Sequence, residues 1–219
     1  MNYARSLGVL LVLVLGGCDT SINSSIVVPD GESRSGSLTS VNGDVSIGED
    51  CTIQGTSRSV NGSVKVGDRS RVESLTVVNG LIRTGEGVSV DGNVESVNGT
   101  VELGAGSEVS GEVVTVNGSI ELDQTVVQFD VRTVNGDIEL RNKSVVKGDI
   151  VIEDKMGFST RTRPIEIEVT GGSIIEGDIV VKRNVDVRLI LRDGGKVLGQ
   201  VDGAEVIDKN VAPPAVDDD

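Results

Sequence analysis

The residue types that carry out most hydrolytic and transfer chemistry are scarce in this sequence. It contains no histidine and only two cysteines, Cys18 and Cys51, among its 219 residues. The absence of histidine excludes Ser-His-Asp and Cys-His nucleophiles and histidine metal ligands. A glycosidase would need two carboxylates about 5–10 Å apart and usually an aromatic-lined cleft, but the only aromatic residues after Cys18 are Phe129 and Phe158. We therefore expect no enzyme activity and no cofactor.

Acidic residues offer the remaining route to a metal site. Four of them fall at similar places in a repeated turn: Glu49, Asp50, Asp68 and Glu86. Carboxylates stacked in neighbouring turns could bind a divalent cation weakly. The column is interrupted, however, by Ala105, Gln124 and Asn142, and the Gly-Gly-x-Gly-x-Asp calcium repeat is absent. We predict a solvated acidic face and no metal site.

Cys51 occupies a repeat position that otherwise carries small residues. The aligned residues are Ser70, Val88, Ser107, Thr125 and Ser144. A lone small thiol in such a column is typical of core packing rather than of a reactive nucleophile. We expect Cys51 to face the interior.

Cys18 follows a short apolar segment near the N-terminus. Arg5 precedes the apolar run 7–15, which is too short to span a bilayer and is typical of a secretory signal. The stretch Leu15-Gly16-Gly17-Cys18 resembles the bacterial lipobox, in which the peptidase cuts before a diacylglyceryl-modified cysteine. The resemblance implies a signal peptide over residues 1–17 and lipid attachment at Cys18. The alternative is an ordinary secretory signal followed by an incidental cysteine.

These residues are positioned by a repeat. The triplet V-N-G recurs at 41–43, 60–62, 78–80, 97–99, 116–118 and 134–136, with its glycines 18 or 19 residues apart. A fixed period near 20 is typical of a solenoid. Alternating strands follow each triplet, and a second turn recurs about twelve residues later, for example at Gly92 and Gly111. The pattern predicts an all-β, single-domain, three-sided parallel β-helix of about eight coils. A right-handed coil is favoured because parallel crossovers are right-handed in about 98% of cases.

The V-N-G corner predicts its own packing. A tight corner needs φ > 0, which glycine adopts freely and asparagine tolerates. Asparagines at one coil position should stack in a ladder of amide hydrogen bonds; the alternative is an asparagine-lined ligand groove. We expect the valine to face the core, so that Val97 would be fully buried in the middle of the stack.

The repeat also sets the domain boundaries. Residues 18–25 are short and polar and are predicted to form a tether, and 26–207 carry the β-helix, the later coils having lost V-N-G. The period is broken by a loop insertion at 154–164. Residues 208–219, with two prolines and three terminal aspartates, are predicted to be a disordered acidic tail.

The insertion is the predicted interaction site. It brings Met156, Phe158, Arg161 and Arg163 to an acidic, aromatic-poor body, and insertions in repeat proteins often form the binding face. The alternative is that Phe158 and Met156 merely cover Phe129, which takes a corner position that is glycine in other coils. The formal net charge of −14 opposes binding to nucleic acid.

Two family resemblances rest on the repeat residues. The segment 133–140 (T-V-N-G-D-I-E-L) resembles bacterial putative-adhesin β-helix proteins, and Gly148-Asp149-Ile150 and Gly177-Asp178-Ile179 resemble the half-repeats of bactofilins, which form cytoskeletal polymers. The resemblance covers about residues 26–207 and implies a scaffold or surface role without catalytic residues.

We therefore expect a membrane-anchored envelope lipoprotein, on the periplasmic or surface side, that acts as a structural scaffold or an adhesin-like interaction module. Its expected partners are the membrane, through the lipid anchor, and an envelope protein or glycan. Self-association, a bactofilin-like polymer and a glycan-binding or glycan-processing β-helix are the alternatives.

Overall fold

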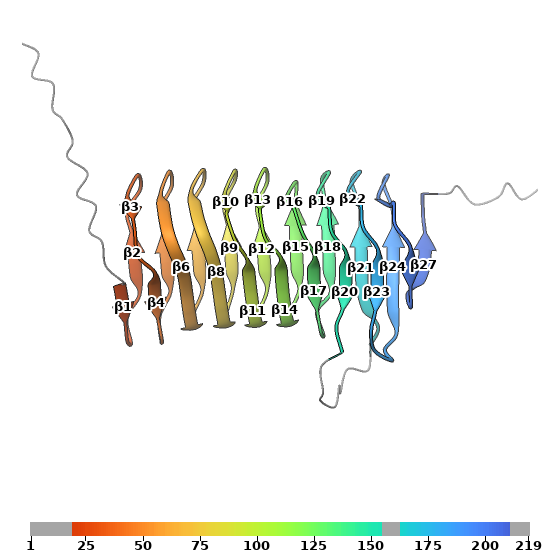
Figure 1. The fold of residues 1–219 in the computed structure, drawn as a ribbon, viewed down its shortest axis with the longest axis horizontal. Coiled ribbons are helices and arrows are strands. Elements are labelled where there is room, and N and C mark those ends of the chain that lie inside the picture. Colours follow the sequence, from red (N-terminus) through yellow and green to blue (C-terminus); the bar gives the residue numbers. More distant parts are fainter. Residues whose placement is uncertain (1–18, 155–162, 211–219) are drawn as a thin grey trace, which may run out of the picture.

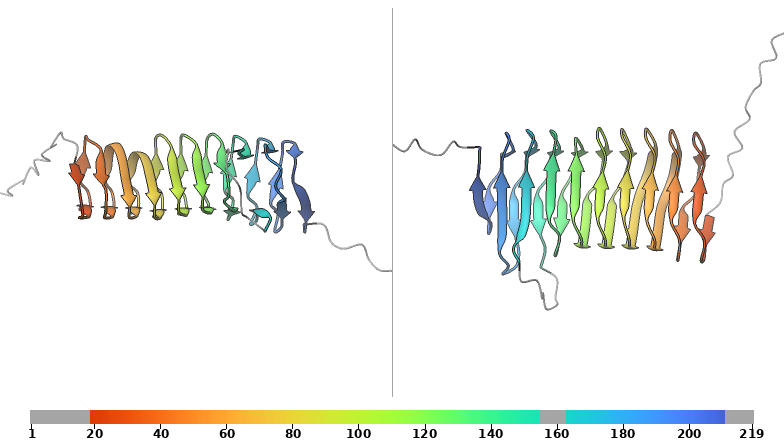
Figure 2. Two further views of the ribbon diagram at one scale, coloured as in Figure 1. Left: turned by 90° about the horizontal axis from the view of Figure 1, so that it is seen from below. Right: turned by 180° about the vertical axis from the view of Figure 1, so that it is seen from behind.

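The computed structural model describes residues 19–154 and 163–210, which form one solenoid of short parallel strands. No segment of these residues is helical, and the all-β solenoid prediction is confirmed. Successive turns stack along the long axis from the N-terminal to the C-terminal end (Figure 1), and the views from below and from behind show the same stack (Figure 2). None of the described elements is a helix that could cross a membrane.

Each turn contributes a strand to each of three stacked faces. The first face consists of β2 (Ile26–Val28), β5 (Val45–Ile47), β7 (Val64–Val66), β9 (Ile82–Thr84), β12 (Val101–Leu103), β15 (Ile120–Asp123), β18 (Ile138–Arg141), β21 (Ile165–Val169), β24 (Val187–Leu191) and β27 (Glu205–Asp208). The second consists of β3 (Ser33–Arg34), β10 (Ser89–Val90), β13 (Glu108–Val109), β16 (Val126–Val127), β19 (Val145–Val146), β22 (Ile174–Ile175) and β25 (Lys196–Val197). The third consists of β1 (Asp19–Ser21), β4 (Leu38–Ser40), β11 (Val94–Asn98), β14 (Val113–Asn117), β17 (Val131–Thr133), β20 (Ile150–Ile152), β23 (Ile179–Val181) and β26 (Val201–Asp202). Two longer strands, β6 (Thr52–Asn61) and β8 (Arg71–Asn79), run through both the second and the third face.

The solenoid is longer than the expected eight coils. The first face has ten strands, so the chain makes about ten turns. At the N-terminal end, β1 pairs with β4, with Asp19 opposite Leu38, so the first turn already occupies the segment predicted to be a tether. At the other end, the backbone N–H of Lys209 donates to the carbonyl oxygen of Leu191 at 2.7 Å. These end turns lack V-N-G but keep the strand register, which is why the motif alone gives too low a count. The tail was predicted to begin at residue 208, but Asp208 belongs to β27; residues 211–219 of the predicted tail lie outside the described residues.

The core is a narrow column of aliphatic side chains from all three faces. In β15, for example, Ile120 and Leu122 point inward and are fully buried, while Glu121 between them points outward. Each aliphatic side chain buried in this way contributes about 1.5–3 kcal/mol. Because every inward residue stacks on its equivalent one turn away, stability is spread along the whole rod.

The V-N-G valines do not belong to this core cluster, contrary to the prediction, although Val134 is buried. Val97 is 40% exposed, whereas Ser96 before it is 3% exposed. In the strand β11 the inward positions are set by Val94 and must alternate, so Ser96 faces inward and Val97 outward. The inward position next to the corner usually carries a hydroxyl because that group hydrogen-bonds the corner backbone. The Ser59 Oγ–H, for example, donates to the carbonyl oxygen of Gly43 at 2.8 Å.

The glycine of V-N-G is required by close stacking rather than by its dihedral angles. Gly80 and Gly118 alone among these six glycines have positive φ, at 153° and 151°, and none of the asparagines does. A Cβ atom added to Gly99, however, would overlap the carbonyl oxygen of Gly80 in the turn below. At this corner, left-handed backbone occurs in the end turns, at Asn23 and Gly203, and most of it lies instead in the turn between the first and second faces. The left-handed residues of that turn are Gly31, Asp50, Arg69, Gly87, Gly106, Gln124, Asn142, Lys143, Gly171, Gly172, Asp193 and Gly194.

The predicted amide ladder is present and is longer than V-N-G indicates. Each Nδ2–H group donates to the Oδ1 atom of the asparagine one turn earlier, at distances of 2.6–3.0 Å. The ladder contains Asn23, Asn42, Asn61, Asn79, Asn98, Asn117 and Asn135. It runs along an exposed corner, which favours the ladder over a ligand groove.

Removing one rung should have a modest effect on stability. Asn98 donates to Asn79 at 3.0 Å and accepts from Asn117 at 2.9 Å. Asn98→Ala removes both hydrogen bonds, but the neighbouring amides are exposed and can bind water, so we expect a loss of about 1 kcal/mol in the free energy of unfolding by urea. Ser110→Ala, at an exposed position, is the control and should change stability by less than about 0.5 kcal/mol. Equal effects of the two substitutions would show that the ladder contributes nothing.

Candidate functional site

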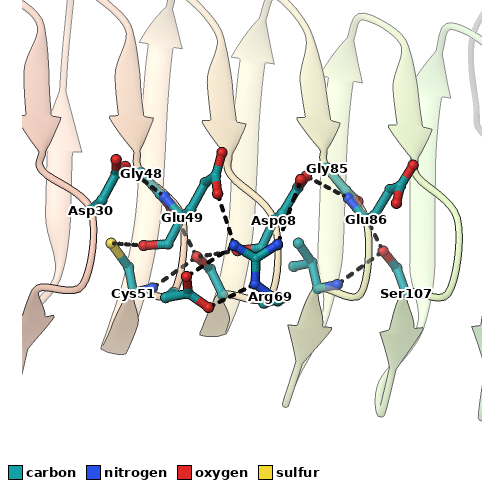
Figure 3. A network of polar contacts seen from close by, with 12 residues as sticks. Asp30, Gly48, Glu49, Cys51, Asp68, Arg69, Gly85, Glu86 and Ser107 are labelled. Atoms are coloured by element: carbon teal, nitrogen blue, oxygen red, sulfur yellow. Dashed lines mark hydrogen bonds and ion pairs between the residues drawn. The ribbon is translucent and has the colours of Figure 1, made fainter.

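Cys51 lies where the repeat predicted, inside the solenoid. It is 1% exposed and aligns with a column of buried small residues, including Ser70 and Ser107. Its thiol donates to the carbonyl oxygen of Glu49 at 3.4 Å (Figure 3) and to that of Pro29 at 3.1 Å. Its backbone N–H donates to the Ser70 Oγ atom at 3.0 Å. Like the hydroxyls of this column, the thiol donates hydrogen bonds to backbone carbonyl oxygens of the left-handed turns, so its role is structural.

The turn acids that could have bound a cation surround an arginine instead. Arg69 makes ion pairs with Glu49 at 2.8 Å, Asp50 at 2.9 Å and Asp68 at 3.9 Å (Figure 3). The hydrogen bond from Arg69 lowers the pKa of Asp50 below its ordinary value. The Oδ1 atom of Asp68 is also occupied, because it accepts the backbone N–H of Glu86 at 2.8 Å. Across residues 19–154 and 163–210, no group of three or more His, Cys, Asp or Glu residues could hold a metal ion.

A second acidic feature, which the sequence reasoning missed, is a column of glutamates on the first face. Strand register places four glutamates in consecutive turns: Glu102, Glu121, Glu139 and Glu168. Three arginines neutralise the column in part. Arg83 pairs with Glu102, Arg141 pairs with Glu121 at 3.2 Å and Glu139 at 3.5 Å, and Arg192 pairs with Glu168. A signal was available, since the first three glutamates each follow a V-N-G glycine by three residues.

The glutamate column has the carboxylate spacing of a glycosidase but not its cleft. Neighbouring parallel strands lie about 4.8 Å apart, within reach of the separation that retaining glycosidases use. The adjoining depression of about 220 Å³ is lined by Glu121, Glu139, Glu166 and Glu168 together with Asp137, Ser119, Ile120 and Ile138, and no aromatic residue is among them. This composition favours an ion-pair network on the solenoid wall over a sugar-cleaving site.

The predicted contact residues of the insertion fall mostly outside the described residues, as Met156, Phe158 and Arg161 do. Arg163 is described, and its Nη2 group donates to the Asp137 Oδ2 atom at 2.6 Å. The insertion lengthens its turn, because Ile150 pairs with Ile179 across 29 residues instead of 18 or 19. Phe129 is 58% exposed at the corner where neighbouring turns have glycine. Whether Phe158 covers this ring or contacts a partner remains a prediction.

A shallow groove on the third face adjoins the start of the insertion. Its volume is about 340 Å³, and its lining includes the outward valines Val114, Val116 and Val134 beside Arg132 and Glu153. Arg132 pairs with Glu153 at 2.9 Å and Glu112 at 3.4 Å, and Lys182 also pairs with Glu153 at 3.2 Å. Burial acts against ionisation of Glu153, but hydrogen bonds from Lys182 and Arg132 outweigh it and lower the pKa of this carboxyl. The sequence reasoning missed this groove because it placed the V-N-G valines in the core.

Comparison with known proteins identifies no relative. No protein-family model, no curated protein and no solved structure matches this chain. The fold is therefore the level at which the chain is classified: it is a single β-solenoid of about ten parallel turns.

Proposed function

We propose that the chain is a membrane-anchored envelope lipoprotein whose β-solenoid acts as a structural scaffold or adhesin-like interaction module. The lipobox-like stretch before Cys18 supports the anchor. The resemblance of 133–140 to putative-adhesin β-helix proteins supports the surface role. The proposed site is the periplasmic or outer side of a bacterial membrane, and the proposed partners are the membrane and an envelope protein or glycan.

The observation that carries the proposal is where the solenoid begins. Asp19, the residue directly after Cys18, already pairs with Leu38, and its backbone N–H donates to the Ser37 carbonyl oxygen at 3.0 Å. A lipid on Cys18 would therefore hold the first turn at the membrane surface. About ten turns at ~4.8 Å each would then form a rod of roughly 45 Å.

The surface of the rod suits a scaffold or binding role better than catalysis. The sequence has no histidine, and the acids in the turn and on the first face are paired with arginines. We propose that it is not an enzyme. We propose the groove on the third face as the place where an envelope partner binds. Exposed Phe129 and the insertion residues Met156, Phe158, Arg161 and Arg163 are further proposed contacts.

Replacing the predicted lipid-attachment residue should change the location of the protein. We expect Cys18→Ser to move most of the protein from the membrane fraction to the soluble fraction, because the lipid on Cys18 is the proposed anchor of the mature chain, from which residues 1–17 are removed. Fractionation of cells followed by immunodetection measures this. The matched control is Cys51→Ser, which replaces the other cysteine at a buried position and should leave the distribution unchanged.

The mass of the membrane-bound protein provides the second measurement. The wild type should carry the added mass of a lipid at Cys18, and the Cys51→Ser variant should carry the same mass. If Cys18→Ser stays in the membrane fraction to the same extent as the wild type, the lipoprotein proposal is wrong.

A further inference from the structure

The N-terminal end of the solenoid is closed by charged residues. Strand register places Asp19 next to Leu38 and Arg34 next to Ile53, at positions whose side chains face inward in the following turn. Glu32 occupies the position next to Cys51 in the same way. The Arg34 guanidinium pairs with Glu32 at 2.7 Å and Asp19 at 3.2 Å, which forms an ion-paired lid over the second and third faces of the core. Charges at inward positions of an edge strand prevent another strand from adding to it.

The C-terminal end lacks such a lid. Val197, Val201 and Val206 continue the inward columns of Ile175, Ile179 and Leu189. Val206 is 50% exposed although Leu189, one turn earlier in the same column, is fully buried. Asp208 is the one charged residue among the inward positions of β25, β26 and β27.

The last three strands also have a free edge. Within the described part of the chain, β25 pairs only with β22, β26 only with β23, and β27 only with β24. Unpaired edges beside exposed core side chains are suited to pairing with further strands. Residues 211–219 are poorly suited to fill this place, because Pro213 and Pro214 have no backbone N–H and the segment ends in three aspartates.

We propose that the C-terminal end binds the C-terminal end of a second copy of this chain, in a two-fold, end-to-end dimer. A two-fold axis through the corner at Gly199 and through Ile207 of β27 would pair β27 with its equivalent and β25 with β26 of the other copy. The pairing is antiparallel because a two-fold axis reverses the strand direction. The charged lid at the N-terminal end limits assembly to dimers and prevents longer filaments.

The residues that this axis brings together are complementary. Val197 of one copy lies opposite Val201 of the other, so inward side chains meet. Lys196 lies opposite Asp202, and Glu205 lies opposite Lys209, so outward charges of opposite sign meet. Leu198, which is 65% exposed in the single chain, would be covered by the same contact. The same axis places inward Val206 opposite inward Asp208, which is the one mismatched pair. The second copy is favoured over an unrelated partner because the Val197–Val201 pair and the outward charge pairs are self-complementary.

The test is a charge reversal at the predicted pair. The measurements use the chain with Cys18→Ser, which cannot carry the proposed lipid, as the reference protein. Its mass, measured by sedimentation equilibrium over a wide concentration range, should change from monomer to dimer as concentration rises. Lys196→Glu alone and Asp202→Lys alone each turn two attractive pairs per dimer into repulsive ones, and each should weaken dimerisation roughly tenfold or more. The double variant exchanges the charges and should restore most of the affinity of the reference protein.

Three controls separate this contact from other causes. Lys65→Glu, in the middle of the rod, should leave dimerisation unchanged, and circular dichroism should show that all variants are folded. The chain should dimerise while residues 211–219 are still present. A reference protein that stays monomeric, a dimer unaffected by either single reversal, a double variant without recovery, or dimers that form only after deletion of residues 211–219 would each overturn the proposal. Because none of these measurements depends on the lipid, the result is independent of the proposed anchor.

Discussion

Gly99→Ala should destabilise the solenoid by about 3 kcal/mol or more, although it adds only one methyl group. The added Cβ atom would overlap the backbone carbonyl of Gly80. A carbonyl in a ladder cannot move aside as a flexible side chain can, so the corners of adjacent turns must separate. Separation strains the amide ladder on one side and the strand pairing on the other. Urea denaturation followed by circular dichroism measures the loss.

A second glycine provides the control that isolates the steric effect. Gly106 has a φ of 72°, but the nearest atom that an added Cβ would meet is 3.8 Å away. Gly106→Ala therefore incurs only the cost of a left-handed backbone, which is about 1–2 kcal/mol. If Gly106→Ala were as destabilising as Gly99→Ala, close stacking would not be the reason for glycine at the V-N-G corner.

The largest loss should follow Ile120→Asp. Ile120 is fully buried in the middle of the stack, between Val101 and Ile138. A carboxylate there would have no polar partner, and we expect a cost of about 4 kcal/mol or more, a large part of the total stability of a typical domain. Where this variant does not fold, Ile120→Ala gives a measurable substitute, with an expected cost of about 2–5 kcal/mol.

Val97→Asp is the informative comparison for the core. Val97 looks like a core residue in the sequence, but its side chain is 40% exposed. The charge stays in contact with water, so we expect a loss below about 1 kcal/mol in the same urea experiment. Similar losses for Ile120→Asp and Val97→Asp would contradict the inward and outward positions described above.

The periodic parts of this fold could be predicted from the sequence because the structure is a repeat of one turn. Spacing between V-N-G glycines gave the turn length, and the stacking of one turn on the next then fixed the amide ladder and the position of Cys51. These features depend only on which residues share a repeat position. Because neighbouring turns pair in parallel, residues at the same repeat position lie next to one another, one strand spacing apart.

The orientation of residues within the turn was harder to predict. Val97 is apolar and lies in a strand, and a shift of one position reverses the face of every side chain in it. The sequence shows the apolar residue but not that Ser96 is inward, since a serine in a core is explained only by the corner carbonyls it can reach. The need for glycine at Gly99 was likewise attributed to φ, because a close approach between turns has no sequence signature.

The ends and the groove could not be predicted from the repeat. Asp19 belongs to the first turn without any V-N-G motif, so the predicted solenoid began too late, at residue 26. The glutamate column could have been predicted, because its first three residues share one repeat position. Its arginine partners could not, because they come from different positions in the turn. The groove by Arg132 depends on the outward direction of Val114, Val116 and Val134, which followed only once the strand orientation was known.

The V-N-G corner also affects how the protein ages chemically. An asparagine followed by glycine is prone to lose ammonia when the glycine nitrogen attacks the side-chain carbonyl carbon, and this chain has the dipeptide at six corners. Here both groups are engaged: the amides bond one another, the Gly80 N–H donates to the Asn98 carbonyl oxygen at 3.1 Å, and the Gly99 N–H donates to that of Asn117 at 2.9 Å. The attack therefore requires two neighbouring turns to open together. The ladder that aligns the corners thus protects them from conversion into a row of mutually repelling carboxylates.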